Sequence, residues 1–179
     1  MAEGVSNGDV EPTNRRTISD ALLGTRGGIA STVYGTVVVM ATLTVGYASE
    51  KRPWKLFVIV STTAIVLWIA HLYAHGLSES ISRDRRLTWK ELTEIARREI
   101  GILLAAGFPS AALLLGAIGV LKETSAVWLA LAIGLATLAA EGVRYARVER
   151  LSGLATLAVV AGNLALGSFV VLLKVLVAH

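Results

Sequence analysis

Two histidines and a glutamate recur at a spacing of four at the end of one long apolar stretch. The stretch covers residues 54–79, and its last turns contain His71, His75 and Glu79. An α-helix places residues four apart on the same face. Two imidazoles at this spacing are a common chelating pair for a divalent metal ion, and the same imidazole and carboxyl groups can relay protons. This one helix face therefore holds most of the candidate chemistry of the chain.

The residues around these side chains predict helices that cross a membrane. Of the 179 residues, 54% are hydrophobic and only 17% are charged, which is more apolar than a soluble domain. The apolar residues fall in blocks of about 20, the length that a helix needs to cross a bilayer core of ~30 Å. We therefore expect an all-α, polytopic membrane protein with a single domain over residues 18–179. Its five transmembrane helices are predicted at about residues 28–48, 54–77, 100–121, 126–144 and 154–177.

The segments outside these blocks predict a tail, a surface helix and short turns. Residues 1–17 contain almost no apolar side chains and predict a disordered cytoplasmic tail. Residues 18–23 predict the start of a helix on the membrane surface. Between the second and third spans, Thr88 and Glu91 have the spacing of a capping box, which predicts a short amphipathic helix on the cytoplasmic surface. A turn is expected at residues 122–125.

Small residues mark the faces on which the spans are expected to pack closely. They are Ser31, Thr32, Gly35 and Thr36 on the first span, and Gly101, Gly107, Gly116 and Gly119 on the third. Pro109 lies within the third span and predicts a kink there. Packing through small-residue faces also predicts a homodimer.

The distribution of Lys and Arg predicts the orientation of the chain in the membrane. The N-terminal side of the predicted spans holds Arg15, Arg16, Arg26, Arg83, Arg85, Arg86, Lys90, Arg97, Arg98, Arg144, Arg147 and Arg150, and the opposite side holds Lys51, Arg52, Lys55, Lys122 and Lys174. Twelve against five places the N-terminus in the cytoplasm and the C-terminus outside, in a cell inner membrane. The net charge of +4 suits a bilayer with anionic headgroups. No aromatic-interleaved basic surface points to nucleic acid.

Ionisable residues recur at one predicted depth, near the cytoplasmic edge of the spans. This layer comprises Arg26, His71, His75, Glu79, Glu141 and Arg144. Three interpretations stay open: a network of ion pairs and hydrogen bonds that sets helix depth, a divalent-metal site, and a proton relay. The metal site would use His71, His75, Glu79 and Glu141. Asn163, near mid-membrane, predicts a hydrogen bond between helices.

Several kinds of chemistry are not expected. The chain has no cysteine, so disulfides and thiol catalysis are excluded. No P-loop, dinucleotide fingerprint, zinc-protease motif or nucleophile elbow is visible. We therefore do not expect an enzyme, and the candidate cofactor is a divalent metal ion. The first residues are polar and acidic, so no cleavable signal peptide is expected.

Local patterns add a family resemblance. Ala74-His75-Gly76, followed by Arg85-Arg86-Leu87, forms a glycine-containing exit from the second span, and Phe108-Pro109 lies within the third. With the five-span topology, these patterns resemble the vacuolar iron transporter family. Where that family has an aspartate–glycine pair at the start of its first helix, this chain has Arg26-Gly27-Gly28. The resemblance implies five membrane helices, a helical cytoplasmic insert after the second, and metal transport. In its residue usage the chain also resembles small integral membrane proteins of high-GC bacteria.

The sequence thus predicts an integral membrane protein with two alternative functions. The first is a transporter-like protein for a divalent metal cation or protons, in which His71, His75 and Glu79 bind the ion, Glu141 assists and Arg26 tunes their charge. The alternative is a non-catalytic membrane scaffold or an accessory subunit of a larger membrane complex, in which the same residues serve structure.

Overall fold

The computed structural model of the chain describes residues 26–49 and 51–177, and of residues 26, 27, 173–175 and 177 it describes the backbone alone. Every regular element in these residues is a helix, which confirms the predicted all-α class. The helices are α2 (Arg26–Ser49), α3 (Pro53–Ser82), α4 (Trp89–Arg98), α5 (Ile100–Ala117), α6 (Glu123–Val148) and α7 (Gly153–Val177). The predicted tail at 1–17 and helix start at 18–23 lie outside the described residues.

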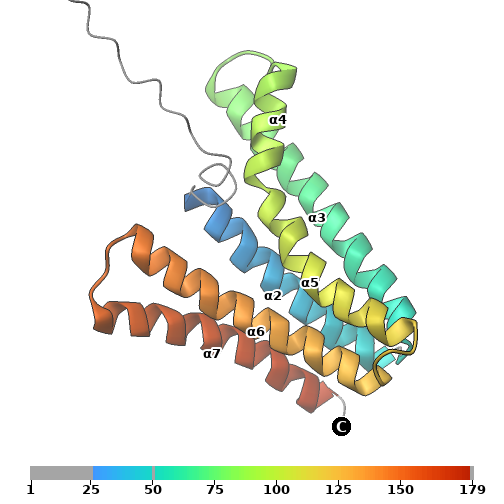
Figure 1. Ribbon diagram of the computed structural model, residues 1–179. Coiled ribbons are helices and arrows are strands. Elements are labelled where there is room, and N and C mark those ends of the chain that lie inside the picture. Colours follow the sequence, from blue (N-terminus) through green and yellow to red (C-terminus); the bar gives the residue numbers. More distant parts are fainter. Residues whose placement is uncertain (1–25, 50, 178–179) are drawn as a thin grey trace, which may run out of the picture.

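Five of the helices, α2, α3, α5, α6 and α7, are long enough and apolar enough to cross a membrane. Successive long helices run in opposite directions, so their connections alternate between two ends of the bundle (Figure 1). We call the end that holds α4, the first turn of α2 and the α6–α7 connection the α4 end. The α2–α3 and α5–α6 connections lie at the opposite end. This alternation is the arrangement that a multi-pass membrane protein requires.

α2 is the central helix of the bundle and packs against α3, α5, α6 and α7. Its side chains Met40 and Leu43 are fully buried. They belong to one hydrophobic cluster that also contains Leu56 of α3, Leu113 of α5 and Leu131 of α6. α3 and α7 lie at the periphery (Figure 1), and most of the surface of these two apolar helices is exposed. Exposed apolar surface of this extent is typical of a helix that faces lipid.

Glycines bring α2 and α5 into close contact. A Cβ atom added at Gly35 would lie 2.8 Å from the Cα of Ile102, and one added at Gly101 would lie 2.5 Å from Oγ1 of Thr32. The predicted small-residue face of the first span is therefore confirmed as a packing face. The same prediction was wrong for Gly107 and Gly119, because an added Cβ atom at either would meet nothing within 4 Å.

α5 ends at Ala117, whereas the sequence predicted a helix to about residue 121. Gly119 adopts a left-handed φ of 80°. Its N–H donates to the carbonyl of Gly116, and the N–H of Val120 donates to the carbonyl of Leu115. These two bonds form a Schellman motif, which closes a helix one residue before its left-handed glycine. Pro109 is buried within α5, which stays helical on both sides of it, and the predicted kink stays a prediction.

Two other helices are longer than predicted. α3 continues to Ser82 instead of ending near residue 77, because no residue stops it before Asp84, whose φ is 48°. α6 begins at Glu123 and ends at Val148, where 126 and 144 were predicted. The turn expected at 122–125 was therefore wrong, since Glu123 already forms the first turn of α6, where a carboxylate favours the helix dipole.

Candidate functional site

Glu99 joins α4 to α5, and its carboxyl group is buried among three elements. Its Oε2 accepts a hydrogen bond of 2.7 Å from the hydroxyl of Ser31 on α2. Its Oε1 lies 3.2 Å from Nδ1 of His75 on α3. Because Glu99 stands at the start of α5, the positive end of that helix's dipole also favours its carboxylate. A buried carboxyl group with two polar partners is therefore the centre of the candidate site.

His75 connects this buried group with the outside. Its side chain is 56% exposed, whereas that of Glu99 is 10% exposed. One ring nitrogen of His75 faces the carboxylate, so the other is available on the exposed side. A neutral His75 with its hydrogen on Nδ1 can donate that hydrogen to the Glu99 carboxylate, and an imidazolium would form an ion pair with it.

The close packing of α2, α3 and α5 positions these three side chains. Ser31 lies one turn before Gly35, so the α2–α5 contact that Gly35 permits also places Ser31 opposite the start of α5. On the other side, the indole N–H of Trp68 donates to the carbonyl of Ala96 at 3.2 Å. This bond ties α3 to the last turn of α4, three residues before Glu99. Trp68 is thus part of the support of the site.

His71 lies one turn before His75 on the same face of α3, as the sequence predicted. Its Nδ1 is 3.1 Å from the carbonyl oxygen of Leu67. A carbonyl oxygen only accepts, so Nδ1 carries the hydrogen and a neutral His71 presents Nε2 as an acceptor. Its ring centroid lies 6.1 Å from that of His75 and 5.0 Å from that of Tyr34 on α2. The two imidazoles are neighbours, but His71 is not bonded to Glu99.

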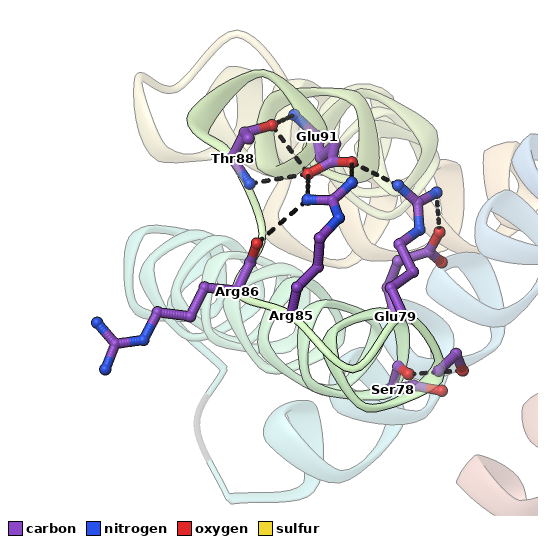
Figure 2. Close-up of polar contacts among 8 residues, drawn as sticks. Ser78, Glu79, Arg85, Arg86, Thr88 and Glu91 are labelled. Carbon is purple, nitrogen blue, oxygen red and sulfur yellow. Dashed lines mark hydrogen bonds and ion pairs between the residues drawn. The ribbon is translucent and has the colours of Figure 1, made fainter.

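Glu79 belongs to a separate group of charges at the turn between α3 and α4, which we call the elbow cluster: Glu79, Arg83, Arg85 and Glu91. Glu79 accepts from Arg83 at 2.5 Å, and Arg83 also bonds to Glu91. Arg85 donates to both oxygens of Glu91, at 2.6 and 3.1 Å. Figure 2 shows the Glu91 carboxylate facing Arg85 across the turn. The cluster fixes the turn rather than offering free ligands.

Thr88 and Glu91 form the predicted capping box at the start of α4. The backbone N–H of Thr88 donates to Glu91 at 2.8 Å, and the N–H of Glu91 donates to the Thr88 hydroxyl. The Arg85 guanidinium, followed by these Thr88 contacts, lowers the pKa of Glu91 from 4.5 to about 2. Glu91 therefore keeps its charge at a lower pH than an ordinary glutamate.

Glu141 and Asn163 lie at a second place, a cavity of about 520 Å³ between α2, α6 and α7. Glu141 pairs with Arg144 at 3.2 Å. Asn163 donates to the carbonyl of Leu138 at 3.0 Å, which is the hydrogen bond between helices that the sequence predicted. Tyr34 and Tyr145 also line the cavity, and the rest of the lining is apolar.

The structure brings together only part of the predicted ionisable layer. His71 and His75 are neighbours, but Glu79 and Glu141 each pair with an arginine close by in their own segment. Across residues 26–49 and 51–177, no three His, Cys, Asp or Glu side chains are grouped so that they would hold a metal ion. The side chain of Arg26 lies outside the described residues.

Sequence reasoning did not select Glu99. It counted this glutamate among the charges of an Arg-rich segment, whereas the structure buries it. The signal was its position: Glu99 is the last charged residue before the apolar run of the third span, where a carboxylate sits at the start of a helix. Its partner Ser31 had been noted only as a small residue on a packing face.

Comparison of the chain with protein-family models, with curated proteins and with solved structures finds no match.

Proposed function

We propose that this protein is a five-span inner-membrane protein that binds and releases protons at Glu99, with His75 as the group through which protons reach it from the cytoplasm. The observation that supports this most strongly is the contact between a buried carboxylate and a half-exposed imidazole, at 3.2 Å. Ionisable residues within membrane helices usually mark ion or proton pathways.

The membrane placement is supported by helix length, apolar surface and charge. α3 has 30 residues, or ~45 Å at ~1.5 Å per residue, and so exceeds a hydrocarbon core of ~30 Å. Its surplus turns, which contain His75, would lie at headgroup level at the α4 end. That end also holds most of the basic residues, so the positive-inside tendency places it in the cytoplasm. α4, with Trp89 exposed, would lie along the membrane surface.

The proton step needs no group beyond these side chains. A proton taken up at the exposed Nε2 of a neutral His75 gives an imidazolium that faces the Glu99 carboxylate. The Nδ1 proton can then pass to Oε1, which leaves a neutral imidazole and a carboxylic acid. The hydroxyl of Ser31 donates to the other carboxyl oxygen and can do so in both states. Release to the cytoplasm follows the same steps in reverse, and flux across the membrane requires release from Glu99 toward the opposite side.

Protons are favoured over a divalent metal ion by the partners of the predicted ligands. Glu79 is bonded to Arg83, and Glu141 to Arg144. A metal ion would have to replace those arginines, and two imidazoles alone are a weak site. Metal transport, which the family resemblance implies, is therefore the second candidate for the same face of α3.

The test is proton flux in vesicles that contain the purified protein and an enclosed pH-sensitive dye. Glu99→Gln keeps the size and the acceptor for Ser31 but removes the titrating group, so we expect flux under an imposed pH gradient to fall about tenfold or more. Glu94→Gln replaces an exposed glutamate of α4. It is the matched control, and its proton flux should equal that of the wild type. Equal flux in the wild type and Glu99→Gln would overturn the proposal, and flux that depends on added divalent metal would favour the second candidate.

One observation supports the alternative of a scaffold or accessory subunit. The outer face of α3 carries a groove of about 590 Å³ lined by apolar residues and by Thr62 and Thr63. Small polar residues on an otherwise apolar membrane helix favour contact with another helix. A second copy of the chain or another membrane protein would fit this face. A folded wild-type protein with no proton flux would support this alternative.

A further inference from the structure

A groove of about 250 Å³ lies between the last turns of α3 and the segment that leads into α4. Its walls are mainly leucines: Leu72 and Leu77 from α3, and Leu87 and Leu92 from beyond the turn. Gly76 forms its floor, where an added Cβ atom would lie 3.7 Å from both Leu87 and Leu92. The groove is thus apolar, open on one side, and built from two elements that the elbow cluster holds together.

One charged residue, Arg86, lines this groove. Its two arginine neighbours in the cluster, Arg83 and Arg85, are neutralised by Glu79 and Glu91. The Arg86 backbone carbonyl accepts from Arg85, and Figure 2 shows its side chain extending away from Glu91. Within the part of the chain that the structure describes, no carboxylate pairs with the Arg86 guanidinium. An uncompensated cation therefore lies beside an apolar groove.

The depth of the groove suits a lipid. α3 is ~15 Å longer than the hydrocarbon core at ~1.5 Å per residue, and Leu72, Leu77 and Arg86 all belong to its last turns or to the residues just beyond. In the membrane placement proposed above, Leu72 lies at the outer limit of the acyl region, and Leu77 and Arg86 lie at the level of the headgroup phosphates. Arginine binds phosphate oxygens through two parallel hydrogen bonds.

We propose that this groove binds one anionic phospholipid of the cytoplasmic leaflet, with its phosphate on Arg86 and one acyl chain along Leu72, Leu77, Leu87 and Leu92. The site rests on the proposed membrane placement but not on the proton step. The elbow cluster fixes the turn that carries Arg86, and the Ser80 hydroxyl adds a hydrogen bond of 2.9 Å to the backbone carbonyl of Arg85.

The test is a titration of the full-length protein in neutral detergent with phosphatidylglycerol, with bound lipid counted by native mass spectrometry. Arg86→Gln should weaken binding about tenfold. Arg97→Gln, which removes an exposed arginine of α4 that does not line the groove, should change it less than twofold. Leu77→Gln keeps the charge of Arg86 but puts a polar group in the groove. It should weaken phosphatidylglycerol binding about fivefold. Phosphatidylcholine should bind about tenfold more weakly than phosphatidylglycerol.

Three results would overturn the site: unchanged binding in Arg86→Gln, equal losses in Arg86→Gln and Arg97→Gln, or equally tight binding of glycerol phosphate, which has the headgroup but no chains. Glu99→Gln separates this proposal from the proton function, because it should bind phosphatidylglycerol as the wild type does even if its flux is lost.

Discussion

Glu91 keeps its charge at a lower pH than an ordinary glutamate, because Arg85 and Thr88 bind its carboxylate. A group whose folded pKa is depressed stabilises the fold above its ordinary pKa and loses that effect as pH falls toward the folded value. For Glu91 the stabilisation is complete above about pH 4.5 and is lost as pH falls toward about 2. The wild type and Glu91→Gln should therefore differ in thermal midpoint at pH 7, and the difference should shrink as pH falls from about 4.5 toward about 2.

The measurement is a thermal melt of both proteins in detergent at pH values from 7 to about 2. Glu94→Gln is the control, because Glu94 is an exposed glutamate of the same helix and should melt with the wild type at pH 7. A constant difference between the wild type and Glu91→Gln over the whole range would mean that the charge of Glu91 contributes nothing.

The sequence was least informative about the contacts of single side chains. It identified the His71–His75 spacing and the Thr88–Glu91 cap, since both depend on a fixed separation within one helix. It could not identify the Glu99 contacts, because Ser31, His75 and Glu99 come from three elements whose lateral order is not encoded in any local pattern. Glu79 pairs with Arg83, four residues later, and its predicted role in ion binding stays a prediction.

Among the elements, the crossing of α2 and α5 does the most to position the site. Gly101→Ala would place a Cβ atom 2.5 Å from Oγ1 of Thr32 and 3.0 Å from the carbonyl oxygen of Gly28. Because Gly28 contributes backbone, the helices must move apart, and overpacking of this kind costs typically ~1–3 kcal/mol. We expect a lower thermal midpoint and, since Glu99 is the N-cap of α5, a weaker Ser31–Glu99 bond with reduced proton flux.

Gly107→Ala is the matched control for this prediction. It lies on the same helix, where an added Cβ atom meets nothing within 4 Å, and alanine favours a helix over glycine by up to ~1 kcal/mol. It should therefore leave the midpoint unchanged or raise it. If both substitutions lowered the midpoint equally, the effect would come from helix flexibility and not from the close contact of α2 and α5.

The existence of the long helices followed from the sequence, and their ends did not. A stretch of about 20 apolar residues that crosses a bilayer must be a helix, so the apolar stretches alone predicted five helices. The ends depend on single residues with unusual backbone angles. Gly119 ends α5 early. α3 runs on to Ser82, two residues before Asp84, a residue that tolerates the left-handed conformation better than most.

At the scale of the whole molecule, the alternating direction of the helices determines which side chains lie at the same end of the bundle. Five crossings would put the first turn of α2 and the last turn of α7 on opposite sides of the membrane, and the alternation brings His75, Glu99 and the phospholipid groove together at the α4 end. The sequence predicted this end to be cytoplasmic from its basic residues. It could not predict that Glu141 and Asn163 share a cavity with Tyr34, because that requires the lateral packing of α2, α6 and α7.

Labelling of single cysteines with a membrane-impermeant maleimide tests this arrangement most directly, because the chain has no native cysteine to give a background. We would place one cysteine at Glu94 of α4 and another at Lys122 in the α5–α6 connection, both exposed. In right-side-out vesicles, Lys122→Cys should be labelled at once and Glu94→Cys only after the vesicles are opened. Labelling of both positions from the same side, or in the reverse order, would contradict a five-span protein whose Glu99–His75 pair takes its protons from the cytoplasm.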